Sequence, residues 1–186
     1  MDLDTKLILS IPIETNRLTL DHWQSSDWIE FRPIATDPQV MRYITGGVPW
    51  TDEQIRNFVD RQITLFAARG FCRWKLLRKP DRKLAGFCGV GFWRDAPDPE
   101  IGWWLERESW GQGLATEAAQ AALQHAFQAT DHPRIISVAR PENAASIRIM
   151  EKLGMKFDRE FSSDGLQLVR YAIERSRWRT NESLQP

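Results

Sequence analysis

Two glycines stand directly before an alanine-rich segment, in the stretch Trp110-Gly111-Gln112-Gly113-Leu114-Ala115-Thr116-Glu117-Ala118. The alanine-rich segment predicts a helix over residues 114–129. The first backbone N–H groups of a helix have no partner within it and carry partial positive charge. Because glycine has no side chain, an anion can approach these N–H groups closely. The loop is therefore a candidate pyrophosphate site, although the same glycines also fit a simple tight turn.

The loop differs from two common phosphate-binding patterns. The Walker A pattern ends in Gly-Lys followed by Ser or Thr, which is missing here, so ATP hydrolysis is not expected. The dinucleotide fingerprint requires a third glycine at the position of Thr116. Further along, Asn143 and Ser146 open a predicted helix that Gly154 ends. Each of these two residues alone is typical of an ordinary helix start.

The elements around these motifs alternate between strands and helices. Thr51 and Gln54 form a capping-box pattern, followed by an apolar helical stripe that ends before Gly70. Strands are predicted over 17–20, 71–77, 84–93, 101–105 and 135–139, helices near 28–31, over 51–69, 114–129 and 143–153, and a closing hairpin over 155–173. This order predicts one mixed α/β domain over residues 1–186, with a core at 14–174 and a frayed tail at 175–186.

Composition and charge exclude several classes of protein. The chain has 186 residues, 25 basic and 25 acidic, and 42% are hydrophobic, which is ordinary globular composition. With zero formal net charge, no overall field favours nucleic acid or an anionic membrane. Two cysteines and three histidines without ligand spacing predict neither a disulfide framework nor a metal site. No apolar run approaches the ~18 residues of a membrane span, so a cytoplasmic protein is expected.

Four segments together carry a family resemblance. They are Glu14-Thr15-Asn16-Arg17-Leu18, Glu100-Ile101-Gly102-Trp103-Trp104-Leu105, the glycine loop at 110–118, and Asn143-Ala144-Ala145-Ser146 continuing to Lys152-Leu153-Gly154. In this order they resemble the GNAT superfamily of acyl-CoA-dependent N-acetyltransferases, in its RimJ/RimL-like branch of ribosomal-protein N-terminal acetyltransferases. The resemblance covers about residues 14–174.

The resemblance implies an α/β (α+β) fold with a central, mostly antiparallel sheet of about six or seven strands and about four flanking helices. The family's fourth and fifth strands splay apart, and acetyl-CoA, the implied co-substrate, enters between them. By position, the backbone of Trp103, Trp104 and Leu105 would pair with the pantetheine arm, and Asn143 would reach it from the other side. The implied pyrophosphate donors are the backbone N–H groups of Gly111, Gln112, Gly113, Leu114, Ala115 and Thr116.

The implied chemistry is direct attack of a primary amine on the thioester in a ternary complex. Glu100 is the candidate base, and Asp98 is the alternative because a one-residue shift of the strand would exchange which side chain faces the cleft. The Trp103 N–H is a candidate oxyanion donor. Ser146 is the candidate acid, because Met150 stands where many members carry a proton-donating Tyr.

A second departure from the family pattern is Glu108, an acidic residue where many members carry Gln or Arg. Its carboxylate would repel a pyrophosphate unless it turns away, so the expected cofactor contacts are those of the backbone.

The acceptor amine is left open by the sequence. A protein N-terminal amine is the first hypothesis, a small amine such as an amino acid, polyamine or drug is the second, and a catalytically silent acetyl-CoA-binding module is the third. A slot could be lined by Trp23, Trp28, Trp50, Trp93, Trp103 and Trp104, but core packing is expected for most of them. Asp95, Asp98, Glu100, Glu106 and Glu108 surround the fourth strand and are expected to form a solvated rim. Either a monomer or a homodimer is compatible with the sequence.

Overall fold

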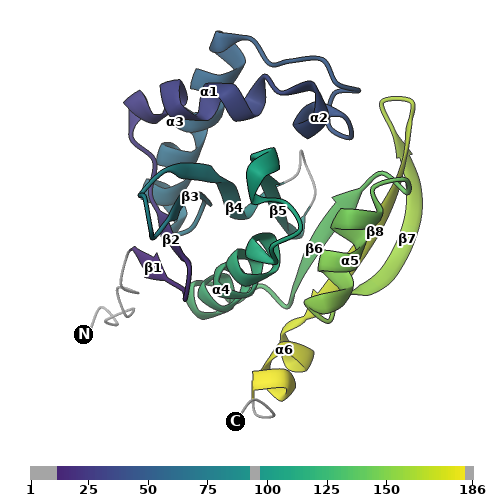
Figure 1. Ribbon diagram of the computed structural model, residues 1–186. Coiled ribbons are helices and arrows are strands. Elements are labelled where there is room, and N and C mark those ends of the chain that lie inside the picture. Colours follow the sequence, from purple (N-terminus) through teal and green to yellow (C-terminus); the bar gives the residue numbers. More distant parts are fainter. Residues whose placement is uncertain (1–11, 93–96, 183–186) are drawn as a thin grey trace.

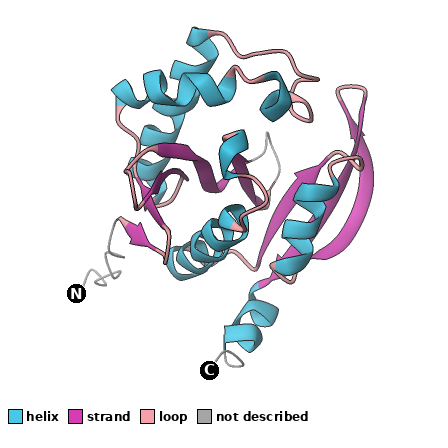
Figure 2. Cartoon of the chain, viewed as in Figure 1, coloured by secondary structure: helices cyan, strands magenta, loops and turns pink. Residues whose placement is uncertain are grey.

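The computed structural model describes residues 12–92 and 97–182, and all its strands belong to one sheet (Figures 1 and 2). The sheet order is β1-β2-β3-β4-β5-β6-β8-β7, and every neighbouring pair is antiparallel except β5 and β6, which are parallel. The strands are β1 Ile13–Glu14, β2 Leu18–Asp21, β3 Arg73–Arg78, β4 Leu84–Phe92, β5 Pro99–Leu105, β6 Arg134–Ala139, β7 Lys156–Ser163 and β8 Leu166–Glu174. This is the mixed, mostly antiparallel sheet that the resemblance implies, with eight strands.

Helices cover both faces of this sheet (Figure 1). They are α1 Trp28–Ala35, α2 Pro38–Met41, α3 Asp52–Arg69, α4 Leu114–Ala129, α5 Ala144–Lys152 and α6 Arg175–Glu182, with short 3-10 turns η1 Ser25–Asp27 and η2 Arg107–Ser109. One apolar cluster joins α4 to the side chains of Trp74 and Ile101. A second cluster joins α1 and α3 to the opposite face, which Phe87 and Trp104 supply. Alternation of side chains along β5 therefore sends neighbouring residues into different cores.

The predicted helix boundaries of α3 are confirmed by their caps. Thr51 and Gln54 exchange side-chain and backbone hydrogen bonds across the first turn, as a capping box does. Gly70 ends the helix in the left-handed conformation at φ 73°. Gly86 of β4 marks a close approach of two strands, because a Cβ added there would lie 1.9 Å from the Trp104 carbonyl oxygen.

The C-terminal segment differs from its prediction. The tail from Arg175, expected to be frayed, forms helix α6 through Glu182. The guanidinium of Arg175 donates to the carbonyl oxygens of Phe127, Thr130 and His132 at the end of α4, which fixes the start of α6. These carbonyls lack helix partners of their own, so the arginine satisfies them. Before α6, the predicted hairpin between β7 and β8 turns at Asp164 and Gly165, both with positive φ.

In the described part of the chain, no helix combines the length and apolar character needed to cross a membrane. The same residues contain no group of three or more His, Cys, Asp or Glu side chains placed to hold a metal ion.

Candidate active site

Strands β5 and β6 separate just after they meet. Their registered pairing is Glu100 with Ile136, and the Ser137 hydroxyl then donates to the Ile101 carbonyl oxygen at 3.0 Å. Backbone groups alternate between the two edges of a strand, so the groups of Trp103 and Leu105 face the same side as that Ile101 carbonyl. They therefore face the gap beside β6, whereas the backbone groups of Trp104 face β4.

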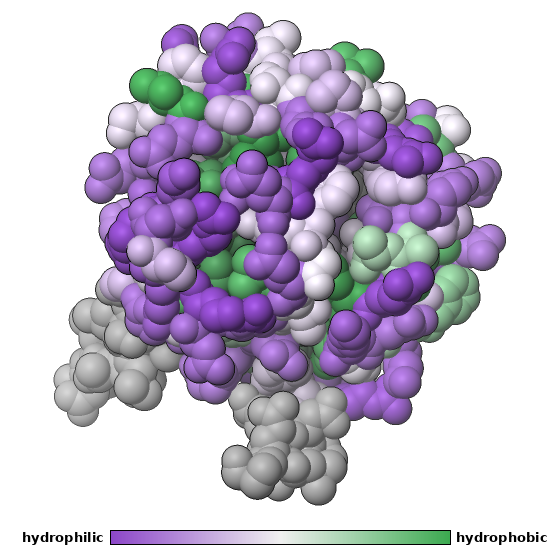
Figure 3. Space-filling model, viewed as in Figure 1, coloured by the Kyte–Doolittle hydropathy of each residue, from purple (hydrophilic) through white to green (hydrophobic). Residues whose placement is uncertain are grey.

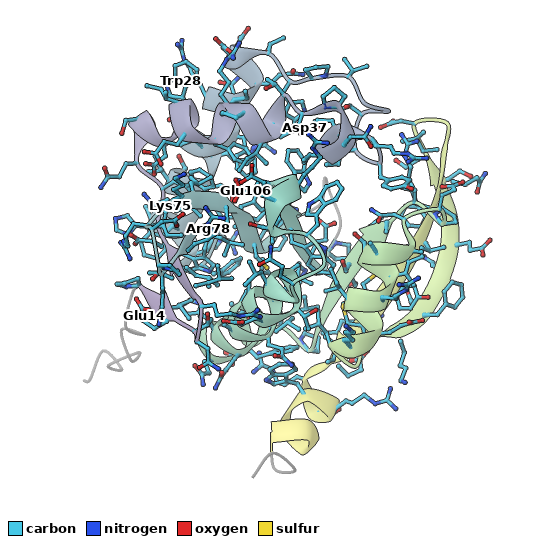
Figure 4. All side chains as sticks on the ribbon, viewed as in Figure 1. Glu14, Trp28, Asp37, Lys75, Arg78 and Glu106 are labelled. Atoms are coloured by element: carbon cyan, nitrogen blue, oxygen red, sulfur yellow. The ribbon has the colours of Figure 1, made fainter. Side chains whose placement is uncertain are left out.

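The end of β5 is held in place by side chains on either side. The Trp110 indole nitrogen donates to the Leu105 carbonyl oxygen at 2.8 Å. Arg78 of β3 and Glu106, which follows β5, lie side by side in Figure 4, with Nη1 and Oε1 3.4 Å apart. These contacts fix the position at which the chain leaves the strand and enters the glycine loop.

The glycine loop has the backbone expected of an anion site. Gly111 and Gly113 lie at φ 72° and 78°, in the left-handed region that favours glycine. A Cβ added at Gly111 would meet nothing within 4 Å, and Gly113, the N-cap of α4, has no side chain that could cap the first N–H groups of this helix. A helix start that follows such an open glycine loop fits a pyrophosphate of acetyl-CoA. Glu108 is exposed to solvent, and its carbonyl oxygen accepts from the Gln112 side chain at 2.6 Å.

Glu117, a residue not predicted for the site, joins the loop to the N-terminal segment. Its carboxylate accepts from the Thr15 hydroxyl at 2.6 Å, the Arg17 backbone at 2.8 Å and the Arg17 side chain at 2.7 Å. Arg17 also donates to the Gln112 carbonyl oxygen at 2.8 Å. Although burial raises the pKa of Glu117, the hydrogen bonds from Thr15 and Arg17 hold it below its ordinary value. Two of the four resembling segments are thus bound to each other, which the sequence order alone does not indicate.

The candidate base Glu100 is a buried carboxylate at the point where β5 and β6 separate. Its side chain is 9% exposed and lies 2.5 Å from the guanidinium of Arg73, measured from Oε2 to Nη2. Burial raises the pKa of Glu100 above its usual range, and the charge and hydrogen bond of Arg73 oppose part of that rise. A raised pKa is typical of carboxylates that exchange protons with a substrate.

The alternative base, Asp98, has a different environment. Its Oδ2 accepts from two nitrogens of Arg134, Nη2 at 2.6 Å and Nε at 2.9 Å. The hydrogen bond and charge of Asp98 raise the pKa of Arg134 above its usual value. This pairing occupies the Asp98 carboxylate before β5 begins.

Asn143 and Ser146 open α5 on the β6 side of the gap. The Asn143 side-chain oxygen accepts from the Ser146 backbone N–H at 3.2 Å, so Asn143 is the N-cap of this helix. The amide nitrogen of Asn143 and the partly buried hydroxyl of Ser146 are both able to donate to a ligand. Met150 is buried in the core between α4 and the sheet, where it packs and offers no proton.

The tryptophans do not line one common slot. Trp23 is buried, and Trp103 and Trp104 pack into the two different cores. Trp50 contacts Trp104 edge to face at a centroid distance of 4.6 Å, and the guanidinium of Arg56 lies 4.1 Å above the Trp28 ring. Trp93 and Asp95 lie outside the described residues.

A hollow on the surface lies between the α1–α2 segment and η2. It is lined by Arg32, Pro33, Thr36, Asp37, Pro38, Gln39 and Arg107. Asp37 caps α2 and accepts from Arg107 at 2.8 Å, so the hollow is bridged by an ion pair next to the start of the glycine loop (Figure 4). On the face seen in Figure 3, apolar and weakly polar residues gather toward the middle between hydrophilic borders.

Comparison with known proteins agrees with this geometry. The model of the acetyltransferase (GNAT) domain family matches residues 17–156. The uncharacterized N-acetyltransferase YnaD of Bacillus subtilis is 31% identical over 144 residues, 77% of this chain and 82% of that protein. The ribosomal-protein-serine acetyltransferase of Escherichia coli is 29% identical over 107 residues, 56% of this chain and 58% of that protein.

A solved structure from the same family extends the agreement to three dimensions. The crystal structure of a GNAT-family acetyltransferase from Bacillus anthracis superimposes with a TM-score of 0.75 at 30% identity, covering 88% of this chain and 98% of that one. The splayed strands, the glycine loop and the family match lead to one conclusion. The chain belongs to the GNAT family and is an acetyl-CoA-dependent N-acetyltransferase.

Proposed function

We propose that this enzyme acetylates the terminal amine of a protein or peptide by direct transfer in a ternary complex, with Glu100 as the base. The observation that carries the proposal is the Glu100 carboxylate, buried at the separation point of β5 and β6 with a raised pKa. An ammonium group has no lone pair, so the acceptor must lose a proton before it reacts. A carboxylate at this position, acting directly or through a water molecule, is suited to accept that proton.

The remaining residues hold the co-substrate in the proposed complex. Acetyl-CoA supplies the acetyl group as a thioester. The N–H groups from Gly111 to Thr116 bind its pyrophosphate, and the free backbone groups of Trp103 and Leu105 pair with the pantetheine arm as an added strand would. Asn143 donates to the same arm from α5. About 17 Å of strand, five residues at ~3.3 Å each, separates Glu100 from Leu105, so base and pyrophosphate site lie at opposite ends of the gap.

The proposed acid is the Ser146 hydroxyl, which donates a proton to the leaving thiolate. Its position on the first turn of α5 places it on the β6 side of the gap, across from β5. The Trp103 N–H, which faces the same gap, is the proposed donor to the developing negative charge.

One observation supports a peptide acceptor. The name of the Escherichia coli relative states that it acts on the serine of a ribosomal protein. Acetylation of a small amine is the competing outcome that the experiment distinguishes.

The test combines acetyl-CoA titration by calorimetry with release of free thiol from a panel of N-terminal peptides and small amines. We expect thiol release with one class of peptide. The variant Glu100→Gln should lose most turnover with little change in acetyl-CoA affinity, whereas Asp98→Asn should keep the activity. Release with small amines alone would overturn the peptide proposal, and a fully active Glu100→Gln would overturn the assignment of the base. Binding without turnover on any amine would indicate the silent module.

A further inference from the structure

Arg73 reaches Glu100 from two strands away. On β3 it lies opposite Gly89 of β4, and on β5 Glu100 lies opposite Gly91. Two strand spacings and the two-residue offset along the strands together amount to about 12 Å, which the extended Arg73 and Glu100 side chains span between them. The charged group of β3 therefore crosses the whole width of β4 to meet the carboxylate of β5.

Glycines on the crossed strands leave room for this side chain. A Cβ added at Gly91 or at Gly102 would lie 3.6 Å from atoms of the Arg73 guanidine group. A side chain extending beyond Cβ at either position would enter the space that the guanidinium occupies. Gly91 and Gly102, on neighbouring strands, thus leave the space in which the Arg73 guanidinium lies. Neither glycine has a positive φ, so backbone conformation does not explain why glycine stands at these positions.

The first residue of β3 is also fixed by its neighbours. The Arg73 backbone N–H donates to the Gln62 side-chain oxygen of α3 at 3.1 Å, and its carbonyl oxygen accepts from the Trp23 indole at 2.5 Å. The guanidinium Nε is buried and has no hydrogen-bond partner among the residues that the structure describes. Glu100 is the carboxylate that engages this cation, through Nη2.

No second charge competes for Glu100 among the described residues that surround it. The strands beside Glu100 place Gly91 of β4 and Ile136 of β6 opposite it, neither of them ionisable. Arg69 of α3 and His132 before β6 contact the Phe92 ring, and the charge that acts on the Glu100 carboxylate is that of Arg73. At the start of the two strands, Arg134 and Asp98 neutralise each other. The ionisation state of Glu100 thus depends on Arg73 more than on any other described group.

A carboxylate this deeply buried needs a cation beside it. Without one, transfer out of water favours the neutral acid, which cannot accept a proton. A guanidinium does not lose its own proton in proteins, so it supports the ionised carboxylate at every relevant pH. We infer that Arg73 is a positioning residue that keeps the Glu100 carboxylate ionised and aimed for proton transfer, which rests on the proposed role of Glu100.

The test is the pH dependence of kcat/KM for Arg73→Gln and Arg73→Lys beside the parent enzyme, with the acceptor concentration expressed as unprotonated amine so that the ionisation of the substrate itself is removed from the profile. Removing the cation should move the acidic limb of the profile upward by about one pH unit or more. At pH values below both acidic limbs the Arg73→Gln variant should then be about tenfold or more slower than the parent, with the ratio returning toward one at alkaline pH. Arg73→Lys keeps the positive charge but replaces the planar guanidinium with an ammonium group, so it should shift the acidic limb by less than Arg73→Gln does.

A matched control is Arg170→Gln on the β7–β8 hairpin. Arg170 is more buried than Arg73 and pairs with Asp158 at 2.5 Å, so we expect its loss to have at least a comparable structural cost. It should leave the acidic limb where the parent has it. Thermal unfolding of each variant checks that the fold is intact, and if Arg73→Gln does not fold, the limb of Arg73→Lys decides.

The outcomes distinguish a failure of the role of Arg73 from a failure of the role of Glu100. Suppose that Glu100→Gln loses the acidic limb, but the Arg73 variants keep the limb at the pH of the parent and lose the same fraction of rate at all pH values. Arg73 then has only a structural role, and the inference is overturned. If Glu100→Gln keeps the limb, the proposed base is wrong and the role of Arg73 fails with it. If the acidic limb of the Arg73 variants moves to higher pH and their rate returns to that of the parent at alkaline pH, the result supports both Glu100 as the base and Arg73 as its positioning residue.

Discussion

Replacing Gly111 with alanine should weaken acetyl-CoA binding far more than it weakens the fold. Gly111 lies at φ 72°, where an L residue costs ~1–2 kcal/mol, and alanine recovers ~0.4–1 kcal/mol by restricting the unfolded chain. An added Cβ meets nothing within 4 Å, so no clash adds to this sum. We expect a net loss of about 1 kcal/mol of unfolding free energy, which lowers Tm by about 2–4 °C in a protein of this size.

The effect on binding has a different origin. The new methyl group would fill part of the open space at Gly111, and we expect it to displace the proposed pyrophosphate from at least one N–H group at the start of α4. Losing one hydrogen bond to a charged group costs about 1.5–3 kcal/mol. The Kd for acetyl-CoA should therefore rise about 10- to 150-fold.

Gly165 offers a control because its backbone has the same left-handed conformation as that of Gly111. It lies at φ 75° in the β7–β8 turn, and an added Cβ there also meets nothing within 4 Å. Gly165→Ala should therefore lower Tm as much as Gly111→Ala does and leave the Kd unchanged. Calorimetric titration with acetyl-CoA and thermal unfolding measure the two quantities. An unchanged Kd in Gly111→Ala, together with the expected fall in Tm, would refute the assignment of this loop as the pyrophosphate site.

Three further predictions concern stability. Gly86→Ala should destabilise the fold by more than ~3 kcal/mol in urea unfolding, because its Cβ would lie 1.9 Å from the Trp104 carbonyl oxygen and the backbone must move; parent-like stability would contradict the close approach. Arg175→Met should cost about 1–3 kcal/mol, since three carbonyl oxygens at the end of α4 lose their donor, and an unchanged urea midpoint would show that α6 is not anchored there. Burial lowers the pKa of His125, so the unfolded chain binds more protons below its ordinary pKa of ~6.5, and stability should fall as pH drops through 6.5 toward 5. His125→Phe should flatten that dependence in thermal unfolding, and an equal slope in both proteins would refute the reasoning.

Local sequence patterns were sufficient wherever a few neighbouring residues control the backbone. The capping box at Thr51 and the glycine end at Gly70 formed where predicted, and the predicted closing hairpin formed with its turn at Asp164-Gly165. Each depends on hydrogen bonds or φ preferences within about four residues, so the chain specifies it without distant contacts. The order of four such segments also predicted the GNAT family, which the family match confirmed.

Helix α6 shows where local patterns were insufficient. Its sequence, Arg-Ser-Arg-Trp-Arg-Thr-Asn-Glu, has no apolar stripe, and it was predicted to be frayed. What starts the helix is Arg175, whose donors reach carbonyls more than forty positions back along the chain. Contacts of this length leave no periodic signal in the sequence.

The candidate site divides in the same way. The sequence by itself predicted the glycine loop, the carboxylate Glu100 and the Asn143–Ser146 helix start as candidates, because each is a residue type at a characteristic place in its own element. Only the tertiary structure decided that Arg73 faces Glu100, that Glu117 binds Arg17, and that Trp103 and Trp104 enter different cores. The physical reason is that strand register and sheet order set these pairings, and both are fixed by the packing of whole faces rather than by any short stretch of chain.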